Sequence, residues 1–124
     1  MIRGVVNARD EATIHLSLKN ARGEEQELEF VIDTGFNGSL TLPPGLIRSL
    51  ELPWRTRGSA VMANGEVDQF DIYAATLMWN NTPRRVLIEE ADTEPLVCMA
   101  LLRGHDVAMR VVDGGPVTIV PLPQ

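Results

Sequence analysis

Short segments in which apolar and polar residues alternate dominate the chain. Residues 12–18 place their aliphatic side chains on one side and polar ones on the other, the period of a half-buried β-strand. Residues 26–32 repeat the alternation after turn residues at 20–24, which predicts a hairpin. Further strands are predicted at residues 2–6, 39–42, 54–63, 66–77, 84–89, 105–112 and 116–122.

Proline and glycine residues punctuate this pattern. Pro43 and Pro44 suit the first turn of a short helix over residues 45–50, and residues 99–103 form a second helical candidate that ends at Gly104. Asn64-Gly65 is the dipeptide most typical of a two-residue hairpin turn. Many short strands with regular turn signals predict an all-β fold, a closed barrel or sandwich, with one or two short helices.

The composition is that of one soluble globular domain, residues 1–124. Hydrophobic residues make up 44% of the chain and charged residues 23%, which is ordinary for such a domain. The formal net charge of −6 argues against a nucleic-acid surface, where a basic patch is expected.

Cysteine and histidine are too few for a disulfide or a zinc site. Cys98 is the single cysteine, and the two histidines have no further cysteines beside them, so no metal or other cofactor is expected. The N-terminal residues lack the apolar stretch of a signal peptide, and no apolar run is long enough to span a bilayer. We therefore expect a cytoplasmic protein that binds neither nucleic acid nor a membrane.

One predicted strand ends on an acid in the stretch FVIDTGFNGSLTL, residues 30–42. Burying the carboxylate of Asp33 costs several kcal/mol unless it is paired or hydrogen-bonded. Thr34 can spend its hydroxyl on a backbone group, and Gly35 leaves its N–H open to a carboxylate. The pattern indicates a loop that holds an acid rigidly. The alternative is an aspartate that simply caps a turn.

Three stretches of the chain resemble the retropepsin-like aspartic proteases of clan AA, in particular their small single-domain prokaryotic members. Residues 30–35, FVIDTG, are similar to the first signature of that family, two or more apolar residues followed by Asp-Thr-Gly. Residues 96–102, LVCMALL, resemble its second signature, which is followed by a short helix, and residues 111–119 resemble its closing hairpin. The resemblance covers most of the chain.

This resemblance implies an aspartic endopeptidase, a hydrolase that cleaves polypeptide through a water activated by two aspartates. The chain has a single Asp-Thr-Gly, so the resemblance implies a homodimer in which two copies of Asp33 meet. Asp33, Thr34 and Gly35 would form the catalytic loop. The hairpin around Asn64-Gly65 would be the flap over the substrate, which Phe36, Asn37, Met62, Ala63, Asn64 and Gly65 would contact. An ordinary surface turn is the alternative for this hairpin.

Cys98 departs from the family pattern, because the second signature has glycine at this position. A side chain here adds atoms at a close approach and gives up the backbone freedom of glycine. The departure keeps a second function open, that of a catalytically inactive dimeric module that binds extended peptide or a partner protein. We expect Cys98 to be a small buried side chain, with a redox role as the alternative. We also expect the apolar segment 117–122 to join the dimer sheet, because an apolar terminal strand needs a partner.

Overall fold

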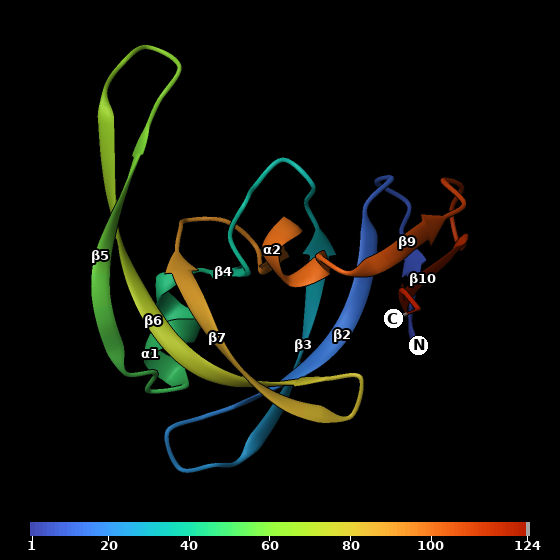
Figure 1. Cartoon of the computed structure of the whole chain (residues 1–124), viewed down its shortest axis with the longest axis horizontal. Helices are drawn as coiled ribbons and strands as arrows, with labels where there is room; N and C mark the ends of the chain where they lie inside the picture. The colour runs from blue at the N-terminus through green and yellow to red at the C-terminus, as the bar shows by residue number, and fades with distance from the viewer. Residues whose placement is uncertain (124) are drawn as a thin grey trace.

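The computed structural model describes residues 1–123, which form ten strands and two short helices (Figure 1). The elements in chain order are β1 (Ile2–Val6), β2 (Ala12–Lys19), β3 (Glu25–Ile32), β4 (Leu40–Leu42), α1 (Pro44–Ser49), β5 (Trp54–Val61), β6 (Val67–Trp79), β7 (Thr82–Glu90), β8 (Leu96–Val97), α2 (Met99–Leu102), β9 (His105–Met109) and β10 (Pro116–Pro121). The prediction of a mostly β chain with one or two short helices is confirmed, and both helices are present.

All ten strands belong to one sheet in the order β5-β6-β7-β4-β8-β3-β2-β1-β10-β9. The long strand β6 also pairs with β2, at Leu77 opposite Leu18, so the strands between them curl into a ring. Most neighbours are antiparallel, but β3 runs parallel to β8 and β4 runs parallel to β7. These two parallel pairs meet where β4 and β8 pair, and they place the chain segment after β3 at the centre of the sheet.

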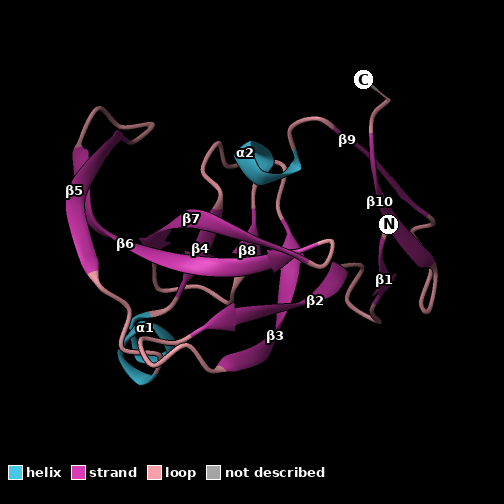
Figure 2. Cartoon of the chain, turned by 60° about the horizontal axis from the view of Figure 1, so that its bottom comes forward, coloured by secondary structure: helices cyan, strands magenta, loops and turns pink. Residues whose placement is uncertain are grey.

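The interior of the ring is filled by the apolar phase of the strands. Ile14, Leu18, Phe30, Leu40 and Ile88 have no solvent exposure. They come from four predicted strand segments, which is why the alternation of residue types locates them correctly. Figure 2 shows α1 and α2 on opposite sides of the central strands. Within residues 1–123 the structure contains no helix long and apolar enough to cross a bilayer.

The last strand lies inside the sheet and not at its edge. β10 pairs with β1 on one side and with β9 on the other, with Ile119 opposite both Ile2 and Val107. The apolar terminal segment therefore already has two partners within its own chain. This removes the reason for which we expected residues 117–122 to pair with a second copy.

The hairpin of β5 and β6 forms as predicted, but its turn is longer than the two residues that Asn64-Gly65 indicates. The strands end at Val61 and Val67, and the Met62 N–H donates to the Glu66 carbonyl. Gly65 has a φ of +85°, whereas Asn64 does not have a positive φ. A two-residue type I′ turn needs positive φ at both central residues, so the hairpin closes through a wider loop with a single left-handed residue.

Candidate active site

Asp33 is fixed by the parallel strands β3 and β8. Its N–H donates to the Val97 carbonyl at 2.8 Å and continues the pairing of Ile32 with Val97 by one residue. The side chain is half-buried, while the loop residues that follow it are exposed. The backbone of Asp33 thus belongs to the sheet, and its carboxylate lies at the border between the protein interior and solvent.

Gly35 holds one oxygen of that carboxylate. The Gly35 N–H donates to Asp33 Oδ1 at 2.8 Å, and a Cβ at Gly35 would come within 3.1 Å of the same oxygen. Glycine therefore lets the backbone approach the acid closely. The bond has the form of an aspartate turn, in which the side chain accepts from the backbone two residues on, so it fits the turn-capping interpretation as well as the catalytic one.

The first turn of α2 anchors the loop that carries Asp33. The N–H groups of Cys98, Met99 and Ala100 donate to the carbonyls of Ser39, Phe36 and Gly38 at 2.9, 3.0 and 3.0 Å. N–H groups at the start of a helix have no partner within the helix, and here the loop supplies their acceptors. The two stretches that resemble family signatures are thus bonded to each other, although about sixty residues separate them.

Cys98 is fully buried next to β4, as expected for a small interior side chain. Its Sγ lies 3.9 Å from the hydroxyl oxygen of Thr41. The backbone of Cys98 is extended, with φ −116° and ψ 176°, so the position does not require the freedom of glycine. Burial raises the pKa of the Cys98 thiol to about 11, the Thr41 hydroxyl opposes this shift, and the negative charges of Asp33 and Glu89 add to it.

Glu89 is a second acid close to this loop that the sequence pattern did not single out. A Cβ at Gly38 would lie 2.6 Å from Glu89 Oε1, so the carboxylate lies against the backbone of the loop. The side chain is half-buried, and burial raises its pKa. In the sequence Glu89 only ends a predicted strand. The one signal available in the sequence was its position in the strand, which places the Glu89 side chain on the face opposite to the buried Val86 and Ile88.

The remaining predicted site residues fall into two groups. Thr34, Gly35, Phe36 and Asn37 follow Asp33 in one exposed loop. The exposed residues Met62, Ala63, Asn64 and Gly65 form the turn of the β5–β6 hairpin, which extends away from the Asp33 loop in Figure 1. The structure thus brings together the first group and leaves the second apart from it.

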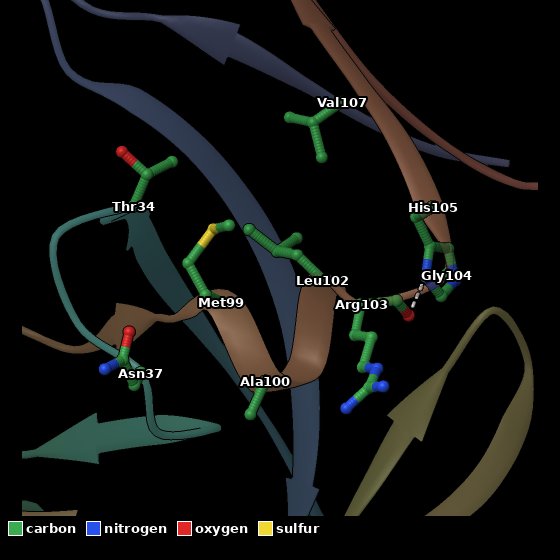
Figure 3. A pocket seen from close by; sticks show the side chains of 9 residues that line it. All are labelled: Thr34, Asn37, Met99, Ala100, Leu102, Arg103, Gly104, His105 and Val107. Atoms are coloured by element: carbon green, nitrogen blue, oxygen red, sulfur yellow. Dashed lines mark hydrogen bonds between the residues drawn. The ribbon is translucent and has the colours of Figure 1, made fainter.

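An open hollow of about 660 Å³ lies beside the Asp33 loop, between α2 and β9. Its lining includes Thr34, Met99, Leu102 and Val107, and Figure 3 shows the last three pointing toward one another from α2 and β9. The surface next to Asp33 is therefore concave and largely apolar. Among residues 1–123 no group of three or more acids, histidines or cysteines is placed to hold a metal ion.

Comparison with known proteins supports the fold. No protein-family model and no curated protein sequence matches the chain. A crystal structure of a retropepsin-like aspartic protease from Rickettsia conorii is similar, with a TM-score of 0.61 over 98% of this chain and 91% of that one, at 12% identity. The chain has the retropepsin-like aspartic protease fold, as the signature stretches indicated. At this identity the likeness concerns the fold alone.

Proposed function

We propose that the protein is an aspartic endopeptidase that acts as a homodimer, with Asp33 of each copy at a shared two-fold axis. The observation that carries the proposal is the position of Asp33 within a retropepsin-like fold. The half-buried carboxylate follows β3, accepts the Gly35 N–H and sits in an exposed loop bonded to α2. A catalytic acid must be held in a fixed position and must be accessible to the substrate from one side.

The chemistry needs two carboxylates, because a single acid cannot serve as base and acid at once. Two carboxylates held close together share one proton, since both cannot ionise at that distance, as is usual in aspartic proteases. The ionised member would remove a proton from a water, and the protonated member would donate to the carbonyl oxygen of the peptide. Such a pair titrates as a unit. Thr34 would orient the loop, and Gly35 would hold one carboxylate oxygen.

The substrate of this proposal is an extended polypeptide. It would lie as an added strand between the β5–β6 hairpin, acting as the flap, and the Asp33 loop, where its main chain gives affinity and side-chain pockets give preference. Phe36 and Asn37 would contact it from the loop. Met62, Ala63, Asn64 and Gly65 would contact it from the flap after a movement of the hairpin toward the loop.

Cys98 is the observation that favours the competing function, a dimeric module that binds extended peptide without cleaving it. The side chain places a buried thiol between the Asp33 loop and Thr41, where the family signature has none. Because the backbone of Cys98 is extended, the position does not need glycine, and this removes one objection to activity. The volume that the side chain adds beside the loop is a second objection, which remains.

The test compares wild type with Asp33→Asn on an unfolded polypeptide between acid and neutral pH, with and without a statine inhibitor that mimics the transition state. We expect inhibitable cleavage by wild type and a loss of at least about a hundredfold in the variant, the scale of a lost general acid or base. Sedimentation of both proteins checks that the variant keeps the assembly. Equal cleavage by both proteins, or a strictly monomeric wild type, contradicts the proposal.

A further inference from the structure

A row of side chains crosses the sheet from the Asp33 loop to the β5–β6 hairpin. Residues paired across neighbouring strands point to the same face of a sheet. Glu89 on β7 pairs with Thr41 on β4 and with Ile72 on β6, and Thr41 pairs with Leu96 on β8. Leu96 in turn pairs with Val31 on β3. All five side chains therefore share one face.

Asp33 and Phe70 continue that face at its two ends. Asp33 follows Val31 by two residues at the end of β3, and Phe70 precedes Ile72 by two residues on β6. A Cβ at Gly58 would lie 2.7 Å from the Phe70 ring and 2.9 Å from the Ile72 side chain, so both side chains cover that glycine. Glu89 thus lies between the catalytic candidate and two half-buried apolar side chains of the proposed flap.

The carboxylate of Glu89 has no ion pair and no side-chain hydrogen bond to the residues that the structure describes. The carboxylate lies against Gly38, where the absence of a side chain leaves room for the acid, and burial raises the pKa of Glu89. Keeping a half-buried acid without a partner is unfavourable, because the charged form loses water and gains nothing in return. A cation delivered by a ligand would offset that cost.

We propose that Glu89 determines specificity by binding a lysine or arginine side chain of a peptide held between the Asp33 loop and the β5–β6 hairpin. The long aliphatic stem of such a residue would pack along Ile72 and Phe70, and its charged head would reach the carboxylate. The inference rests on the proposed function for the location of the peptide, but it concerns binding and does not require cleavage.

The test measures binding at neutral pH to sets of statine-centred peptides that differ only in carrying lysine or norleucine at one position. Norleucine keeps the stem and lacks the ammonium. We expect wild type to bind the lysine peptide at least about tenfold more tightly at one position, and Glu89→Gln to lose this preference. Glu90→Gln is the matched control, since Glu90 neighbours Glu89 on β7 but points to the opposite face. It should keep the preference.

The outcomes separate this inference from the proposed function. Lysine preference that depends on Glu89 without any cleavage supports the inference and contradicts the endopeptidase. Cleavage with equal binding of lysine and norleucine peptides at every position overturns the inference and leaves the endopeptidase. Absence of binding to every peptide also overturns the inference. A Glu89→Lys variant that prefers glutamate peptides would show directly that the charge at residue 89 is read by the ligand.

Discussion

The thiol of Cys98 lies in a buried environment next to two acids, and this has a consequence for stability at high pH. Burial, together with the charges of Asp33 and Glu89, raises its pKa from 9.0 to about 11 in the folded chain. Between these values the unfolded chain loses the thiol proton and the folded chain keeps it. Stability is therefore complete below about pH 9 and falls as the pH rises to 11.

We expect this effect to cost the wild type roughly 2 to 3 kcal/mol of unfolding free energy between pH 9 and 11. Denaturant unfolding of wild type and Cys98→Ala across that range measures it. The variant is expected to start less stable, because it loses buried atoms, and to decline less. Tyr73, whose pKa is also raised by burial, contributes equally to both proteins. Parallel declines would show that the thiol does not control the effect.

At the scale of single residues, the sequence predicts the arrangement of residues that are close together in the chain. The acid, the hydroxyl and the glycine of residues 33–35 are adjacent in the chain, so their arrangement follows from the loop itself. The contact of Glu89 with Gly38 joins positions about fifty residues apart and depends on β7 lying parallel to β4. No local pattern carries that information, so the position of Glu89 beside the loop could be found only in the fold.

At the scale of elements, a contact between Trp79 and His105 holds the end of β6 to the start of β9. The Trp79 indole N–H donates to His105 Nε2 at 3.2 Å, and the rings meet edge to face. Since Nε2 accepts, Nδ1 carries the proton that bonds the Arg103 carbonyl at 3.0 Å. The histidine therefore joins the end of β6 to the short connection between α2 and β9, one wall of the hollow beside the Asp33 loop.

Replacing His105 by phenylalanine keeps a ring and removes the acceptor. Trp79 is only 6% exposed, so its N–H would be left without a partner, at a cost of about 1 to 3 kcal/mol in the free energy of unfolding. Chemical denaturation measures the change. The control is His15→Gln, which removes an exposed pair with Glu29 and should change stability by less than about 0.5 kcal/mol. Equal small losses would mean that the indole finds another acceptor.

Most elements follow from the period of the sequence, and the exceptions have physical causes. Both helices and every described strand except β8 form near their predicted bounds. β8 was not predicted, because its two buried residues, Leu96 and Val97, are too few to show a period. The predicted strand over residues 105–112 stops at Met109, where the exposed residues Val111 and Val112 lead into a turn at Gly114 with a φ of +80°. The predicted strand was too long because these two valines are apolar in the sequence, yet they are exposed to solvent in this chain.

At the scale of the whole molecule, the order of the strands is what the sequence did not predict. Closure of the ring by β6 and β2, and the place of β10 between β1 and β9, depend on pairings between distant segments. A period of two residues identifies strands and their buried faces, but it does not specify neighbours. The fold class could therefore be predicted from the sequence, whereas the strand order is known only from the structure.

The homodimer of the proposed function makes a prediction about the surface next to Asp33. If two copies of Asp33 meet at a two-fold axis, the residues beside the loop must lie at or near the interface. Met99, at the start of α2, is 45% exposed, and its N–H is bonded to the loop at Phe36, which is itself 50% exposed. Apolar side chains in such a place are typical of the buried part of an interface.

Met99→Glu should therefore weaken the dimer, because each interface would gain two like charges close to the symmetry axis. We expect the dissociation constant of the dimer to rise at least about tenfold, with cleavage lost in proportion to the dimer. Sedimentation velocity over a concentration series measures the association. Thr82→Glu adds the same charge at an exposed position at the start of β7, and it should leave the association unchanged. If both variants sediment like wild type, Met99 lies outside the interface, and the two copies of Asp33 would have to meet through a different face.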